Sequence, residues 1–153
     1  GGHLVQFAEP RELFREPATD MVAGFIGNGL VLPIEDIEPD PKGGSAVVRV
    51  FGISQRLRAH RRERSRPRGR LCVHPHDLRL ARPEEAGFSG RVSRVIYRGS
   101  HNQVDFHAEA APEAALSLNV PDGVPLSAGD AISVCIEDGW VIPDLPMHLA
   151  QAA

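Results

Sequence analysis

Lysine, cysteine and aromatic residues are scarce in this chain of 153 residues. Lys42 is the only lysine, and aromatic residues make up 5% of the sequence. No stretch approaches the ~20 apolar residues that a membrane-spanning helix needs. No charged segment followed by an apolar one marks a signal peptide. The sequence therefore predicts a soluble chain, long enough for one domain or for one small domain with an appendage.

The two cysteines, Cys72 and Cys135, both lie in short apolar runs, LCV and SVCIE. Disulfides are rare in cytosolic proteins, where reduced cysteines often pack like small apolar side chains. We therefore expect two buried, reduced thiols in a cytoplasmic protein.

The net charge of −3 gives no overall attraction to nucleic acid or to acidic membranes. Segment 56–70 is the exception, because eight of its fifteen residues are arginine. Charges of one sign repel each other, so we expect a mobile loop or the solvated extension of a hairpin. Binding of single-stranded nucleic acid is an alternative, although the segment has no aromatic residue on which a base could stack. A contact with an acidic partner or with anionic lipid also stays open.

Apolar and polar residues alternate through most of the chain after Leu30. The alternation is clearest in segments separated by turn-forming sequences, namely 47–53, 91–97, 103–109, 116–120 and 130–142. About six to eight short strands with frequent turns are typical of a small barrel or sandwich. Trp140 and Tyr97 fall in strand-like segments, which indicates positions near the core.

Segment 1–27, GGHLVQFAEPRELFREPATDMVAGFIG, has a helical pattern instead. Pro10 suits the first turn of one helix, and Pro17 ends that helix and begins a second one. The second helix carries one apolar stripe, formed by Met21, Val22, Phe25 and Ile26. Gly27 suits the position that follows the last helical residue. Two such short helices need a larger body to pack on.

This segment resembles the end of the ATP-binding domain of ABC-transporter ATPases of the importer class. The shared features occur in the same order and spacing, namely Leu4-Val5-Gln6, the proline-started PRELF at 10–14, Pro17 and MVAGFIG at 21–27. The resemblance implies that residues 1–28 are the closing helices of such a domain and that the chain is its C-terminal part. Residues 29–153 would then form an accessory domain.

The β segments carry the same resemblance. They include LCVHPHDLRL at 71–80, FSGRVSRVIYRGS at 88–100 and AGDAI at 128–132. These resemble the TOBE accessory domain, which implies a mainly β, OB-like small barrel or sandwich preceded by two short α-helices. The family pattern has arginine and glutamate where this chain has His74 and His76, so roles at those two positions are not carried over.

The motifs of an ATPase site are absent from the sequence. Such a site needs a G-x-x-x-x-G-K-[ST] loop, whose backbone amides and lysine hold the phosphates. The chain has no such run, no LSGGQ-like signature and no apolar strand ending in Asp-Glu. In DPKGGS the glycines follow Lys42, which indicates a plain turn. We expect no catalytic and no cofactor-binding residue here, and ATP and Mg²⁺ would belong to the nucleotide-binding domain of the parent protein.

Two other constellations are weaker. The histidines and the aspartate of HPHD (74–77) are zinc-ligand types, and His101 and His107 could join them. The spacing fixes no complete ligand set, and the intervening proline disturbs the H-x-H pair, so we expect hydrogen-bonded or surface histidines and no metal. Ser100, His101 and Asp105 could be drawn as a hydrolase triad, but no G-x-S-x-G elbow supports one.

The resemblance implies a regulatory and dimerisation domain of an importer ATPase. Its partners would be its own nucleotide-binding domain, a second copy of the subunit and, through the parent protein, the membrane permease subunits. The location would be cytoplasmic, at the inner face of the cell membrane, and the solute could be iron, polyamine, thiamine or sugar. Apolar residues of 91–109 are candidates for a paired β surface between copies: Val92, Ile96, Val104 and Phe106.

Two other functions remain as alternatives. A freestanding OB-like module would bind nucleic acid, with an affinity that falls as salt rises. A small-oxyanion-binding domain would be stabilised against thermal unfolding by its ligand. We expect no nucleic-acid partner.

Overall fold

The computed structural model describes residues 29–143, which fold into two compact units. Unit 1 contains residues 29–50, 54–74 and 138–143. Unit 2 contains residues 51–53 and 75–137. Most of unit 2 is therefore a single continuous stretch of sequence that separates two parts of unit 1.

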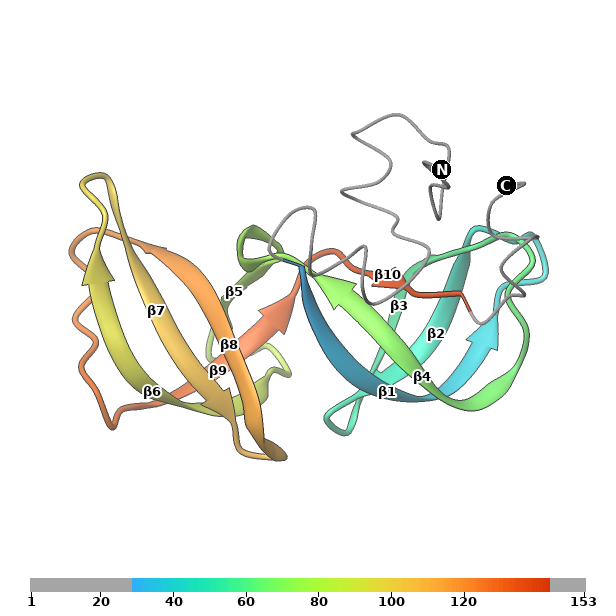
Figure 1. Cartoon of the computed structure of the whole chain (residues 1–153), viewed down its shortest axis with the longest axis horizontal. Helices are drawn as coiled ribbons and strands as arrows, with labels where there is room; N and C mark the ends of the chain where they lie inside the picture. The colour runs from blue at the N-terminus through green and yellow to red at the C-terminus, as the bar shows by residue number, and fades with distance from the viewer. Residues whose placement is uncertain (1–28, 144–153) are drawn as a thin grey trace, which may run out of the picture. The chain divides into compact units, whose positions relative to one another are not determined.

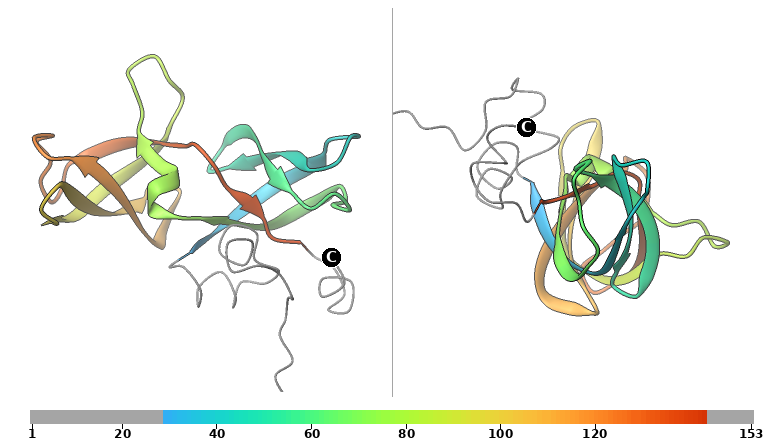
Figure 2. Two further views of the ribbon diagram at one scale, coloured as in Figure 1. Left: turned by 90° about the horizontal axis from the view of Figure 1, so that it is seen from above. Right: turned by 90° about the vertical axis from the view of Figure 1, so that its right-hand side faces the viewer.

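Unit 1 is a closed five-stranded barrel with the strand order β1-β2-β3-β10-β4. Its strands are β1 (Leu30–Pro39), β2 (Ser45–Val50), β3 (Ile53–Ala59), β4 (Arg66–Val73) and β10 (Trp140–Val141). Figure 1 labels these strands, and the right-hand view of Figure 2 shows the ring that they form. The short strand β10 completes the ring, because it pairs in parallel with β3 and antiparallel with β4. Closure leaves the barrel without a free strand edge.

The apolar residues that alternate with polar ones along the strands form the core of the barrel. Its fully buried side chains come from β1, β2, β4 and β10: Leu32, Ile34, Ile37, Val48, Val50, Leu71, Val73 and Val141. Ile34 and Ile37 are three residues apart, which strict alternation would place on opposite faces. A register shift between Glu35 and Glu38, with Asp36 at φ 51°, turns both isoleucines inward.

Unit 2 is a five-stranded antiparallel sheet with the order β5-β9-β6-β7-β8. It begins with a 3-10 helix, η1 (Pro75–Asp77), and continues through β5 (Leu78–Leu80), β6 (Phe88–Tyr97), β7 (His101–Ala108), β8 (Ala111–Pro121) and β9 (Ala131–Ile136). The ring of Phe106 is fully buried and lies 6.2 Å from the ring of Phe88, centroid to centroid. Val104, Leu118 and Val134 are also fully buried, so the inner face of this sheet forms a core of its own.

The mainly β character expected from the sequence is confirmed, but the expected fold class needs a correction. Residues 29–143 contain no α-helix, and their only helical element is the three-residue η1. The two α-helices expected before the barrel would lie in 1–28, outside the described residues. The stretch 29–143 forms two compact units. None of the described helical segments is long and apolar enough to cross a membrane.

The arginine-rich segment 56–70, expected to be a mobile loop or the solvated extension of a hairpin, contains two strand segments. Most of it belongs to β3 and β4, which are joined by a short turn at 60–65. Leu57 and Ala59 are buried on the inner side of β3 and anchor the segment to the barrel. The run of charge concealed a strand pattern in the sequence, in which arginines alternate with inward-facing residues.

Candidate functional site

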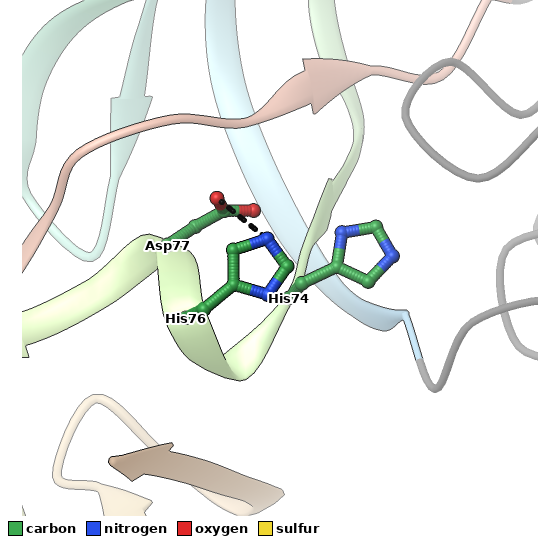
Figure 3. Close-up of side chains that lie close together, drawn as sticks. All are labelled: His74, His76 and Asp77. Carbon is green, nitrogen blue, oxygen red and sulfur yellow. Dashed lines mark ion pairs between the residues drawn. The ribbon is translucent and has the colours of Figure 1, made fainter. Parts of the chain in front are cut away.

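The HPHD sequence lies at the end of β4, where η1 begins (Figure 3). One potential ligand atom from each of His74, His76 and Asp77 lies within 4.8 Å of the other two. Nε2 of His76 is 3.5 Å from Oδ1 of Asp77. His74 and Asp77 are buried, with 4% and 8% of their surface exposed, whereas the side chain of His76 is 60% exposed. Two potential ligands are thus held in the interior and the third faces solvent.

The 3-10 turn explains why this cluster forms despite the proline. Pro75 has no N–H to lose at the first position of a helical turn, so it begins η1 without a hydrogen-bonding penalty. The turn is fixed from the end of β9, because the N–H of Glu137 donates to the carbonyl oxygen of Asp77 at 2.7 Å. Strand pairing of Leu78 with Ile136 follows directly. The other histidines that the sequence suggested, His101 and His107, lie on β7 and are not part of this cluster.

An ion-pair network in unit 2 was not anticipated from the sequence. The guanidinium of Arg79 donates to the carboxylate of Glu85 at 2.7 Å and lies 3.0 Å from Glu137. The hydrogen bonds from Arg79, followed by the backbone N–H of Arg82, lower the pKa of Glu85 to about 2. The same carboxylate raises the pKa of Arg79. The network joins β5 to the loop that leads to β6, and its sequence signal was weak because Glu137 lies far along the chain.

The arginines of segment 56–70 fall into two groups. Arg56, Arg58 and Arg66 are paired with Asp40, Asp138 and Glu63, respectively. The others lie on or near the turn between β3 and β4, and four of them are exposed and make no side-chain ion pair within residues 29–143: Arg61, Arg62, Arg64 and Arg68. Segment 56–70 presents a cationic surface, and its own residues include no aromatic side chain on which a base could stack.

A pocket of about 430 Å³ in unit 2 has a partly apolar wall. Phe51 and Phe88 line it, and their ring centroids are 5.0 Å apart. Glu109 supplies the only charged side chain of the lining. A carboxylate repels an anion, so this pocket does not suit the oxyanion that we considered from the sequence.

Three of the four residues suggested for a surface between copies belong to the core. Val92, Val104 and Phe106 are at most 3% exposed within a single chain. Ile96 is half-buried near the end of β6. Burial removes the first three from any contact surface, since their side chains are already covered. The sequence pattern could not separate a core face from a contact face.

The remaining expectations concern single residues. Trp140 is buried as expected, but Tyr97 is 66% exposed and so is not a core residue. Both cysteines are free thiols; Cys72 is buried and Cys135 is half-buried. Lys42 lies in a turn that Gly43 and Gly44 allow through positive φ angles of 78° and 86°.

The suggested hydrolase triad is not assembled. Oγ of Ser100 lies 3.2 Å from Nδ1 of His101. The carboxylate of Asp105, however, accepts hydrogen bonds from Gln103, Arg94 and Ser117. Asp105 therefore serves the pairing of β6, β7 and β8 and does not orient the imidazole.

Comparison with known families gives a match in the second half of the chain. Residues 71–142 match the family described as TOBE domain. This part of the chain is similar to TOBE domains. It includes η1, β5 to β9 and β10, together with the end of β4.

Relatives of the chain are ATP-binding proteins of importers. An Fe(3+) ions import ATP-binding protein of Brucella suis is 31% identical over 131 residues, which are 86% of this chain and 36% of that protein. The protein of that name from Rhizobium etli is 29% identical over 132 residues, or 84% of this chain and 36% of its own length. An sn-glycerol-3-phosphate import ATP-binding protein of Cereibacter sphaeroides is 34% identical over 136 residues, which are 87% of this chain and 35% of that protein. The chain therefore spans about a third of the length of these curated relatives, whose names state that they are import ATP-binding proteins.

Proposed function

We propose that the chain works as the accessory and dimerisation part of the ATP-binding subunit of an ABC importer. The observation that carries this proposal is the match of residues 71–142 to the TOBE domain family, together with a relative whose similarity extends over 86% of the chain and whose name states an import ATP-binding role. ATP hydrolysis would be supplied by a nucleotide-binding domain, with Mg²⁺, in the same parent protein. The permease subunits would be the membrane partners, and the complex would lie at the cytoplasmic face of the membrane.

The solute proposed first is ferric iron, because several relatives carry that substrate in their names. Glycerol 3-phosphate is the second candidate, on the strength of the Cereibacter sphaeroides relative. The accessory part would act by holding two subunits together, and so it would contact no solute on the transport path.

A chimera tests the importer assignment. The aligned 131 residues of the Brucella suis protein would be replaced by this chain, and ATP-dependent uptake of iron would be measured in cells that lack the native subunit. We expect uptake to be retained, whereas the same protein truncated before the junction should lose it. A chimera that is folded and hydrolyses ATP but supports uptake no better than the truncation would overturn the proposal.

Solution molar mass tests the dimerisation role separately. The chain would be measured over a hundredfold range of concentration, at low and at moderate salt. We expect a dimer that forms with rising concentration, and its persistence at moderate salt would indicate that ion pairs do not dominate the contact. A monomer at every concentration would exclude this part of the chain as the clamp between subunits while leaving the importer assignment in place.

A further inference from the structure

The pocket of about 430 Å³ lies within unit 2, because all of its lining residues belong to that unit. Its volume falls in the range of about 300–1,000 Å³ that is usual for small-molecule sites. Ser89 and Glu109 supply the polar side chains of the lining. The other lining residues are apolar or small: Phe51, Ile53, Gly87, Phe88 and Ala110. The pocket therefore combines two phenyl rings with a single carboxylate.

Phe51 occupies a backbone position that does not suit a bulky side chain. Phe51 and Gly52 form a two-residue turn with φ angles of 48° and 84°. Turns with positive φ at both positions favour asparagine or aspartate before the glycine, and a phenylalanine there is strained. The ring of Phe51 lies against that of Phe88, with centroids 5.0 Å apart and an interplanar angle of 52°. The strained turn thus places a phenyl ring in the wall of the pocket.

Glu109 gives the pocket a negative charge that a ligand can reach. Its side chain is 50% exposed, and its ion pair with Arg91 is long, at 3.6 Å from Nη2 to Oε1. Arg91 is not part of the lining, and its guanidinium donates to the carbonyl oxygen of Gly129 at 2.8 Å. Within residues 29–143 no donor forms a hydrogen bond with the carboxylate of Glu109. A cation that enters the pocket would therefore meet a loosely engaged carboxylate.

The lining favours one class of cation. The face of a phenyl ring attracts positive charge, and a nearby carboxylate adds to that attraction. A primary ammonium group brings three N–H donors that must each find an acceptor, whereas the side chains of this lining offer only a hydroxyl and a carboxylate. A quaternary ammonium group has no N–H donor, and its methyl groups suit an apolar wall. We propose that this pocket binds a small quaternary ammonium cation, with its methyl groups against the phenyl wall and its charge beside Glu109.

NMR titration of the whole isotope-labelled chain tests the proposal, with choline as the probe. The comparison ligand is the uncharged analogue of choline in which a tert-butyl group replaces the trimethylammonium group. We expect choline to shift the amide signals of Phe51, Phe88 and Glu109 in a saturable way, with a dissociation constant in the millimolar range or below. The uncharged analogue should bind at least about fivefold more weakly, because it lacks the attraction to both the ring and the carboxylate.

Two substitutions separate the contributions of charge and ring. Glu109→Gln should weaken choline binding by about two- to fivefold and leave binding of the uncharged analogue unchanged. Glu113→Gln is the matched control, since it removes an exposed carboxylate of unit 2 that is not in the lining, and it should leave both affinities unchanged. Phe51→Leu keeps an apolar side chain but removes the ring, so it should also weaken choline binding by about two- to fivefold. The dispersion of the amide signals shows whether each variant stays folded.

Three outcomes would overturn the proposal. The first is the absence of saturable shifts at tens of millimolar choline. The second is equal affinity for choline and its uncharged analogue, which would make the pocket an apolar site without preference for charge. The third is an equal effect of Glu109→Gln and Glu113→Gln, which would leave only the general charge of the unit. None of these outcomes involves transport, so all are independent of the importer assignment.

Discussion

Glu85 shows how one side chain can link stability to pH. Its carboxylate accepts hydrogen bonds from both Arg79 and the backbone N–H of Arg82. These bonds favour the charged form and lower the pKa of Glu85 from its ordinary value near 4.5 to about 2. A carboxyl group with a depressed pKa in the folded state stabilises the protein at pH values above its unfolded pKa. That contribution is lost as the pH falls from about 4.5 toward 2.

The substitution Glu85→Gln should therefore flatten part of the acid-unfolding profile. We expect the variant to be less stable than the parent at neutral pH, and the difference between them to shrink as the pH falls from about 4.5 toward 2. Urea unfolding at a series of pH values measures the difference. Glu84→Gln is the control, because Glu84 is the adjacent exposed carboxylate outside this ion-pair network. A stability difference that does not change with pH would contradict the role assigned to Arg79.

The geometry of the HPHD stretch was not predictable from residue identity. Pro75 was expected only to disturb the H-x-H pair, whereas it begins a 3-10 turn at 75–77. Tyr97 shows the opposite error, since an aromatic residue in a strand was assigned to the core and is exposed near the end of β6. Burial depends on which strands cover a position, and that information is not local.

At the scale of the elements, β10 joins the end of the chain's described part to the barrel with only two residues. Arg58 on β3 contacts β10 and the residues that precede it. Its guanidinium donates to Asp138 at 2.7 Å and lies 5.8 Å from the centre of the Trp140 ring. The N–H of Arg58 also donates to the carbonyl oxygen of Gly139. The planar guanidinium suits this position because it can pair with a carboxylate and lie over a ring at once.

Arg58→Lys should destabilise the barrel by about 1 kcal/mol, because an ammonium group loses both the two-pronged pairing and most of the ring contact. Trp140 is the only tryptophan, so its fluorescence during urea unfolding reports on this barrel directly. Arg56→Lys is the matched control on the same strand, since Arg56 is exposed and pairs at the surface with Asp40. The control should cost less than about 0.5 kcal/mol. Equal effects of the two substitutions would show that Arg58 contributes no more than a surface ion pair.

Gly90 is required by the packing of β6 against β7. A Cβ atom at this position would lie 2.8 Å from Cδ2 of Phe106 and 3.1 Å from the carbonyl oxygen of His107. Phe106 is fully buried, so its ring could move away only by displacing other core side chains. Gly90→Ala should therefore cost about 1–3 kcal/mol through overpacking.

Thermal unfolding measures the effect of Gly90→Ala. Ser89→Ala is the control, because residue 89 is the exposed neighbour on the same strand, and it should shift the midpoint little. A midpoint for Gly90→Ala equal to that of the parent would mean that the backbone of β6 adjusts and that the close approach is not constraining.

Strands could be predicted where apolar and polar residues alternate regularly. Segments 91–97, 103–109 and 116–120 all lie within strands or at their ends, because their inward residues are apolar and their outward residues polar. Segment 56–70 was misread because its inward positions include alanine and glycine, which carry little apolar signal. Gly69 illustrates this, since a Cβ there would lie 2.5 Å from Cδ1 of the buried Ile37. Gly69 therefore faces inward, but a glycine gives no apolar signal in the sequence.

At the scale of the whole chain, the division into two units could not be read from local patterns. Unit 1 uses segments 54–74 and 138–143, which are separated by more than sixty residues of unit 2. The barrel closes only when β10 pairs with β3 and β4, a pairing that joins residue 140 to residues 58 and 72. Such distant pairing leaves no periodic trace in either segment. The resemblance to a family supplied the TOBE assignment, whereas periodicity gave only short strands.

Because each unit has its own core, a destabilising substitution in one unit should speed hydrogen exchange mainly in that unit. Hydrogen exchange with mass spectrometry can follow the peptides of each unit separately. Gly90→Ala should speed exchange mainly in β6, β7 and β9, because the overpacked Phe106 lies in the core of unit 2. Arg58→Lys should speed exchange mainly in β3, β4 and β10 of unit 1. Ser89→Ala and Arg56→Lys should leave both patterns close to that of the parent. If each damaging substitution instead speeds exchange equally across residues 29–143, the chain opens as one cooperative body, and the two cores are not separate units of stability.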